Sequence, residues 1–302
     1  MTESFKKKLK RPLHGIVKYI GRTNPELLVR MRYYARFHKP LDIDNPQNLN
    51  EKILYLSLRT DTAKWSELAD KYQVREYVKS KGLEDILVPL LGVWDNADAP
   101  DFAELKGKYI LKSTNGSGDF IIVNDSSAID EKAIRKSLRT MLKTNYGELE
   151  GGKHYMRITH RFIAERLLEN DEESAQHSSS LIDYKIWCFN GKADCIWTCL
   201  NRDKNGTDVM TYDTDWNAHP EYSVFNPHYR RGNAIPRPQN LEHMLEIAEQ
   251  LSAGFPVVRV DLYNIAGKIY FSEMTFTSLG GMMDFYTEDF LLDCGKKISL
   301  NV

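Results

Sequence analysis

The chain has 302 residues, with 41 Lys and Arg against 42 Asp and Glu, and a formal net charge of −1. With 42% hydrophobic and 27% charged residues, its composition excludes a disordered or fibrous protein. The longest uncharged apolar stretch, residues 86–94, is about half as long as a membrane span requires. The basic N-terminus lacks the apolar run of a secretory signal, so we expect a cytoplasmic protein.

The near-zero net charge conceals an uneven distribution. Residues 1–40 contain eleven basic side chains and only two acidic ones, a balance of +9, so the remaining residues carry −10. Apolar residues alternate with arginines over 27–37, which predicts a basic amphipathic helix. Either its apolar face packs on the rest of the protein, or residues 1–40 contact an anionic membrane or an anionic substrate. We expect no nucleic-acid partner, because the rest of the chain is acidic.

The segments that follow in chain order predict helices first and then strands. A short helix begins at Asn48, and residues 63–81 predict one longer helix ending at Gly82. Strands are expected at 108–113, 120–123, 161–165, 183–189, 194–200 and 209–212, with a helix capped by Asp130 and another at 241–251. The last three strands are joined by the hairpin signals Asn190-Gly191 and Asn205-Gly206. A hairpin of 257–263 and 268–276 closes the chain. The pattern indicates an α+β fold with mainly antiparallel pairing.

The four cysteines form no CxxC pair and no regular framework. Cys188, Cys195 and Cys199 lie in strand-like sequence, and Cys294 stands alone near the C-terminus. We therefore expect buried, reduced thiols rather than disulfides or a zinc site.

Three groups of residues are candidates for chemistry. The first is a glycine-rich turn at 114–119, where backbone N–H groups and Lys112 could bind a phosphate, although such a turn is often only a turn. The second is the C-terminal hairpin. Alternation places Arg259 with Asp261 on one face and Glu273 with Thr275 on one face, and a tight turn near 264–267 could bring all four together.

Two carboxylates and a hydroxyl that converge in this way would suit Mg²⁺ or Mn²⁺ completed by substrate phosphates. The alternative is a cross-strand pair of Arg259 and Glu273 beside a solvated Asp261. The third group is Asp183 and Lys185, which share a strand face, followed by Arg202. Lys185 and Arg202 could neutralise phosphoryl charge.

Taken in order, these groups resemble the ATP-grasp superfamily, and its TupA-like branch most closely. The similarity extends over about residues 40–280 and includes Asn50-Glu-Lys-Ile, Ala69-Asp-Lys-Tyr, Pro89-Leu-Leu-Gly-Val-Trp, Asn115-Gly-Ser-Gly, Asp183-Tyr-Lys, Cys188-Phe-Asn-Gly-Lys and Arg259-Val-Asp-Leu-Tyr. The resemblance implies two α+β lobes that clamp a nucleotide. It divides the chain into a basic helical arm (1–60), a helix and linker (61–104), a lobe with the glycine-rich loop (105–170) and a lobe with the metal-binding hairpin (171–302).

The resemblance also implies a role for each candidate residue. Cofactor-binding residues would be Lys71 and Lys112 at the ATP phosphates, the loop Asn115, Gly116, Ser117 and Gly118 above them, Glu165 with the backbone of Arg166 and Leu168 at adenine, and Asp183 near the ribose. Catalytic residues around the γ-phosphoryl group would be Lys185, Arg202 and Arg259. One or two Mg²⁺ ions would be held by Asp261, Glu273 and Thr275. Thr275 replaces the asparagine usual in the superfamily, so a water could take its place as a ligand.

The function that the resemblance implies is ATP-dependent ligation of a carboxylate to an amine through an acyl phosphate. The substrates would be a uronic acid of a bacterial surface polysaccharide and an amino acid or another amine. Alternatives are a kinase of the same fold, a glycosyltransferase, or a nucleotide- or glycan-binding protein without turnover.

Overall fold

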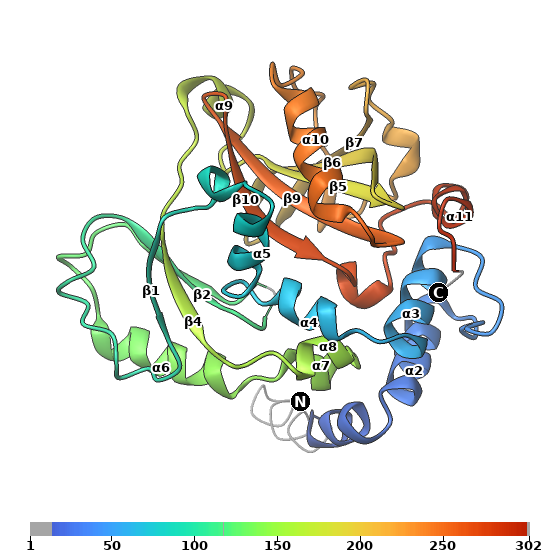
Figure 1. Cartoon of the computed structure of the whole chain (residues 1–302), viewed down its shortest axis with the longest axis horizontal. Helices are drawn as coiled ribbons and strands as arrows, with labels where there is room; N and C mark the ends of the chain where they lie inside the picture. Colours follow the sequence, from blue (N-terminus) through green and yellow to red (C-terminus); the bar gives the residue numbers. More distant parts are fainter. Residues whose placement is uncertain (1–13, 117, 301–302) are drawn as a thin grey trace.

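Two β-sheets form the framework of the protein over residues 14–116 and 118–300, the part of the chain that this computed structural model describes. The larger sheet lies in the upper part of Figure 1 and the smaller sheet in the lower left, with the short helices α4 (Ala63–Ala69) and α5 (Val74–Ser80) between them. All pairings are antiparallel except the short one between β7 and β8. The predicted α+β class is therefore confirmed.

The larger sheet has the strand order β10-β9-β5-β6-β7-β8. Its strands are β5 (Asp183–Phe189), β6 (Lys192–Asp203), β7 (Gly206–Asp213), β8 (Tyr229–Arg231), β9 (Val257–Ile265) and β10 (Lys268–Thr275). The predicted hairpin turns at Asn190-Gly191 and Asn205-Gly206 join β5 to β6 and β6 to β7, because these residue pairs tolerate the backbone of tight turns.

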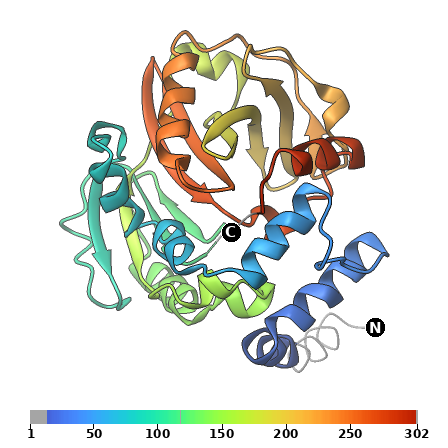
Figure 2. The same ribbon diagram turned by 45° about the vertical axis from the view of Figure 1, so that its right-hand side comes forward.

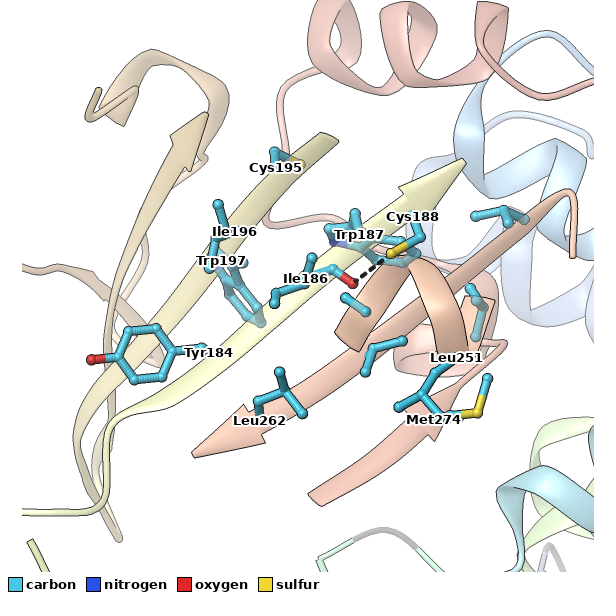
Figure 3. Close-up of a cluster of buried hydrophobic side chains, with 14 of the residues drawn as sticks. Tyr184, Ile186, Trp187, Cys188, Cys195, Ile196, Trp197, Leu251, Leu262 and Met274 are labelled. Atoms are coloured by element: carbon cyan, nitrogen blue, oxygen red, sulfur yellow. Dashed lines mark hydrogen bonds between the residues drawn. The ribbon is translucent and has the colours of Figure 1, made fainter. Parts of the chain in front are cut away.

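The main hydrophobic core lies against this sheet. Helix α10 (Leu241–Ser252) covers one face, where Leu251 packs near Ile186 and Leu262 (Figure 3). Side chains alternate between the two faces along β5 and β9. The charged residues, which follow the apolar ones in each strand, therefore lie on the opposite face. All four cysteines are buried and free, as predicted; the Cys188 Sγ lies 3.9 Å from the Ile186 carbonyl oxygen (Figure 3).

The smaller sheet has the strand order β1-β4-β2-β3. Its strands are β1 (Leu90–Trp94), β2 (Tyr109–Ser113), β3 (Phe120–Val123) and β4 (Phe162–Arg166). Helix α6 (Glu131–Lys143), capped by Asp130 as predicted, packs on one face through Ile134 and Leu138. Strand β1, which lies in the predicted linker segment 61–104, pairs with β4 of the predicted lobe 105–170. The division of the chain into four segments stays a prediction.

The predicted single helix over 63–81 is wrong. It is two helices, α4 and α5, because the side chain of Asp70 accepts hydrogen bonds from the backbone N–H groups of Tyr72 (2.8 Å) and Gln73 (3.2 Å) and so competes with helix continuation. Asp70 is fully buried and also pairs with Arg161 at 3.0 Å. The break places Lys71 in a non-helical turn that faces the glycine-rich loop.

The remaining helices lie around the sheets. They are α2 (Pro25–Phe37), α3 (Leu49–Arg59), α7 (Tyr146–Glu150), α8 (Lys153–Met156), α9 (Glu172–His177) and α11 (Glu288–Lys296), with 3₁₀ turns at Glu84–Ile86, Pro220–Tyr222 and Ser278–Gly281. Residues 14–23 are also helical and precede α2. Within the described residues, no helix is both long and apolar enough to cross a membrane. The basic residues Lys6, Lys7, Lys8, Lys10 and Arg11, and the predicted phosphate-loop residue Ser117, lie outside the described part.

Candidate active site

The C-terminal hairpin brings its four predicted residues together on one face. Glu273 lies opposite Asp261 across the β9–β10 pair, and Thr275 lies opposite Arg259. A β-bulge at Ser272 produces this register. The two-residue turn alone would align Ser272 with Asp261 and direct Glu273 to the opposite face of the sheet. The extra residue in β10 is therefore what joins the two halves of the site.

Arg259 is the centre of the hydrogen bonds on this face. Its guanidinium donates to both Asp261 oxygens at 2.7 Å, to Thr275 Oγ1 at 3.1 Å and to Glu273 Oε1 at 3.4 Å. The Arg259–Glu273 pair of the alternative interpretation is thus present. Its second half, a solvated Asp261, is wrong, because Asp261 is fully buried.

A second cation reaches Asp261 from the neighbouring strand. Lys185 lies opposite it on β5 and contacts both Asp261 and Asp183, the latter at 2.7 Å. Burial alone would raise the pKa of Asp261, but Arg259 and Lys185 outweigh burial and lower it to about 2. The carboxylates in turn raise the pKa of Lys185 above its ordinary value, against the effect of burial. Asp261 and Lys185 therefore carry full charge near neutral pH.

Asp183 carries an acceptor with no protein partner. Its Oδ2 is bonded by Lys185 and, at 3.3 Å, by Arg202, whereas its buried Oδ1 has no hydrogen bond among the described residues. Buried polar atoms are nearly always paired, so this oxygen fits a hydroxyl donor from water or a ligand. The side chain of Arg202 is half exposed and is free to extend toward a ligand.

Glu273 is the accessible carboxylate of the site. Its side chain is 36% exposed, and the hydrogen bonds it receives within the described residues, from Thr275 at 3.0 Å and from Arg259, both reach Oε1. The described residues contain no cluster of three or more His, Cys, Asp or Glu side chains suited to a metal. The donor set fits an ion that Glu273 holds together with phosphate oxygens and water, which is how Mg²⁺ is usually bound; Asp261 could join it only by giving up a contact to Arg259 or Lys185.

The smaller sheet presents a second charged surface. Lys112 on β2 bonds Glu165 on β4 at 3.0 Å, and Arg75 of α5 bonds the other oxygen of Glu165 at 2.9 Å. Since both oxygens of Glu165 are taken by cations, this carboxylate positions Lys112 and is not free for a base. The Arg166 N–H is also used, because it donates to the Pro89 carbonyl at 3.0 Å.

The two surfaces face each other. Burial lowers the pKa of Lys71, and the charges that act on it most strongly are those of Glu273 on β10 and Lys112 on β2. Glu165 and Glu273 together raise the pKa of Lys112, against the effect of burial. Residues predicted for phosphate binding and for metal binding, from opposite lobes, are therefore electrostatic neighbours.

The glycine-rich loop is fixed at the edge of this space. Lys71 Nζ donates to the Gly116 carbonyl at 2.6 Å, and Asn115 Nδ2 donates to the Thr144 carbonyl at 3.1 Å. Gly118 has a φ of +77°, a conformation that favours glycine. A Cβ on Gly116 would lie 2.5 Å from Ser113 Oγ, so that side chain would have to move to admit any other residue there.

The sequence did not identify three residues that lie beside the phosphate-binding candidates. Phe120 and Ile122 on β3 are 50% and 47% exposed and share the face of Lys112, because they lie opposite Lys112 and Ile110. Exposed apolar side chains beside a phosphate-binding lysine are suited to cover a base or ribose. Pairing β3 with β2 in the sequence would have identified them, whereas Arg75 carries no local signal.

A separate cavity lies elsewhere in the fold. It has a volume of about 190 Å³ and is lined by residues of α9, the start of β5, the 235–240 loop and the β9–β10 turn, among them Tyr184 and Asn264. Its lining includes none of the predicted site residues.

Two facing sheets, with cations on both and carboxylates for a metal on one, are the arrangement of an ATP-grasp enzyme. Residues 51–299 match the family model described as TupA-like ATPgrasp, and the chain belongs to this family. The match confirms the predicted family and the predicted ATP-grasp fold.

Solved structures of low similarity accompany this match. The D-alanine–D-alanine ligase of Bacillus anthracis is 14% identical with a TM-score of 0.46, and the alignment covers 80% of this chain and 70% of the ligase. Biotin carboxylase of Campylobacter jejuni is 12% identical with a TM-score of 0.43, over 85% of this chain and 53% of the carboxylase. D-Alanine–D-alanine ligase of Helicobacter pylori is 13% identical with a TM-score of 0.43, over 85% and 69%. No curated protein sequence matches the chain.

Proposed function

We propose that the chain uses ATP to join a carboxylate to an amine. The observation that carries the proposal is the facing of Lys71 and Lys112 on one side with Glu273 and the Arg259–Asp261–Lys185 network on the other. Such a site neutralises the triphosphate from both lobes. The reaction requires no protein nucleophile, so positioning and charge stabilisation supply the catalysis.

Each residue has a role in this reaction. Lys71 and Lys112 hold the phosphates, Phe120 and Ile122 cover the base or ribose, and Asp183 accepts a hydroxyl through its unpaired Oδ1. Mg²⁺ at Asp261 and Glu273 supplies further neutralisation of phosphate charge when bound. Thr275 already donates to Glu273 and accepts from Arg259, so a water serves better than this hydroxyl as a ligand.

The reaction has two steps. An oxygen of the substrate carboxylate attacks the γ-phosphorus of ATP, and ADP leaves with the electron pair of the broken P–O bond. The amine nitrogen then attacks the carbonyl carbon of the acyl phosphate and loses a proton, and inorganic phosphate leaves. Lys185, Arg202 and Arg259 stabilise the charge on the phosphoryl group as it moves.

For the substrates, we propose a uronic acid of a bacterial surface polysaccharide and an amino acid or another amine. The support is the TupA-like family match together with the excess of positive charge in residues 1–40, which favours an anionic glycan acceptor. We propose the cytoplasm as the site of action, since ATP is available there.

Incubation of the purified protein with Mg-ATP and pairs of uronic-acid glycans and amines tests the proposal. We expect ADP, phosphate and a product heavier by the amine minus water, and Glu273→Gln should reduce the rate at least 100-fold. Glu288→Gln is the matched control, because Glu288 is an exposed carboxylate that pairs with Lys39 on the surface. A stable phosphoester would instead identify a kinase, and nucleotide binding without turnover across all pairs would identify a binding protein.

The affinity for ATP provides a second test. Lys112→Met should weaken binding roughly 10- to 100-fold, because a charge-assisted hydrogen bond contributes about 1.5–3 kcal/mol. Lys108→Met is the control, since Lys108 lies at the start of the same strand but pairs with Glu169 on the exposed surface. Equal affinities for the two variants would remove Lys112 from the nucleotide site.

A further inference from the structure

Helix α2 has two apolar faces, and only one of them packs on the protein. Val29 and Tyr33 are 3% and 1% exposed and belong to a small core with α3. Leu27, Met31 and Tyr34 are 45%, 52% and 60% exposed. Their spacing of i, i+4 and i+7 aligns them along the outer side of the helix, where they form a stripe that the other described residues leave exposed.

The preceding helix also exposes apolar side chains. In residues 14–23, Ile16 and Tyr19 are 55% and 62% exposed. A Cβ on Gly21 would lie 1.9 Å from the Glu148 carbonyl oxygen, so this helix packs tightly against α7. Figures 1 and 2 show both helices at the periphery of the molecule. The five exposed side chains Ile16, Tyr19, Leu27, Met31 and Tyr34 are called the outer stripe below.

Basic side chains on the opposite side of α2 fix its orientation. Arg32 contacts Glu150 on α7, Arg36 pairs with Asp284 at 3.3 Å, and Lys39 pairs with Glu288 at 2.7 Å. These bonds attach the side of α2 that lies away from the stripe to the rest of the protein. Arg22 is exposed in the helix that carries Ile16 and Tyr19, and residues 1–40 have an overall balance of +9.

We propose that the outer stripe docks on the surface of an anionic lipid bilayer. Exposed apolar side chains on a helix, within a segment of strong positive charge, are the features that hold a helix in the headgroup region, where weak apolar insertion and electrostatic attraction add together. The proposal concerns where the protein works and is independent of the reaction at the active site.

Charge and size both argue against a protein partner on this surface. A second copy of the chain related by a twofold axis would place basic residues against basic residues, which is unfavourable. A stable protein interface uses about 20–30 residues on each side, far more than the five side chains of the stripe. A lipid surface requires neither shape complementarity nor a minimum area.

Flotation of the full-length protein with vesicles tests the proposal. We expect binding to vesicles of phosphatidylcholine with 30% phosphatidylglycerol, and weaker binding at 500 mM salt or to phosphatidylcholine alone. The triple variant Leu27→Gln, Met31→Gln, Tyr34→Gln should reduce the partition coefficient at least tenfold. Val224→Gln is the matched control, because Val224 is 44% exposed in a loop of the larger lobe.

A charge variant tests the electrostatic half separately. Lys18→Gln with Arg22→Gln should reduce binding to anionic vesicles severalfold while leaving the apolar stripe intact. Absence of binding by the unmodified protein, or equal binding by the triple variant and Val224→Gln, would overturn the proposal. The proposal would also be overturned if the unmodified protein were a dimer and the triple variant a monomer, or if the protein bound soluble anionic glycans but not vesicles. Thermal unfolding of each variant identifies any loss of folding.

Discussion

The buried histidine of α8 makes the stability of the protein depend on pH. His154 is fully buried, packs against Trp65 and Tyr155, and has no hydrogen-bond partner at Nδ1 within the described residues. Burial lowers its pKa to about 3, helped by the positive charge of Arg157. The folded protein therefore keeps this imidazole neutral at pH values where the unfolded chain protonates it.

The sign and size of the effect follow from these two pKa values. Between pH 6.5 and 3 the unfolded state binds the proton and the folded state does not, so stability falls as pH falls through this range. A pH of 5 is about 1.5 units below the ordinary histidine pKa of about 6.5, which the unfolded chain keeps. At about 1.4 kcal/mol per unit, the free energy of unfolding falls by about 2 kcal/mol. Above about pH 7.5 His154 contributes no pH dependence.

Urea unfolding at pH 8, 6 and 5 measures this loss. The unmodified protein should lose about 2 kcal/mol more between pH 8 and pH 5 than His154→Gln, which cannot take up the proton but can still bond Thr277. His243→Gln should behave as the unmodified protein does, because the His243 side chain is 61% exposed. Identical pH dependence in the unmodified protein and His154→Gln would refute the reasoning.

Other parts of the fold lead to further predictions. Gly295→Ala should destabilise the protein by about 2 kcal/mol or more, because the new Cβ would lie 2.1 Å from the Gln47 carbonyl oxygen. Gly15→Ala is the control, because a Cβ there would have no atom within 4 Å. Equal melting temperatures of the two variants would contradict this prediction. Arg161→Met should cost about 3 kcal/mol and weaken ATP binding, because it leaves the buried Asp70 beside Lys71 without its cationic partner; calorimetry with ATP tests both. The native protein should react slowly with Ellman's reagent, because burial raises the pKa of all four cysteine thiols. The urea-unfolded protein should show four reactive thiols. A fast reaction of the native protein would contradict the burial of the cysteines.

Local signals predicted much of the fold. The hairpins at Asn190-Gly191 and Asn205-Gly206, the strands around the glycine-rich loop and the helix capped by Asp130 all depend on neighbouring residues, and each is present. The helix expected at 63–81 was wrong because its break depends on a distant residue: Arg161 holds the Asp70 side chain in the position where it ends α4. A propensity summed along the sequence contains no such contact.

The candidate site shows the same division. A tight turn was expected to bring Asp261 and Glu273 together with Arg259, and the residue types predicted their chemistry; the bulge that makes this register possible carries no sequence signal. Two further partners could not be predicted, since Lys185 lies 76 residues before Asp261, and Arg75 lies 90 residues before Glu165. These pairings depend on how the strands are ordered and how the two sheets meet.

Because of the bulge at Ser272, the site depends on the exact number of residues in the β9–β10 hairpin. Side chains alternate between faces, so the number of residues between Asp261 and Glu273 decides whether the two carboxylates meet. Removal of Ser272 alone would leave every side chain of the site in the sequence and yet direct Glu273 and Thr275 toward the core. The hairpin can thus accept changes of residue type more readily than the loss or gain of one residue, and a related chain with a deletion here would keep the motif in its sequence without the site.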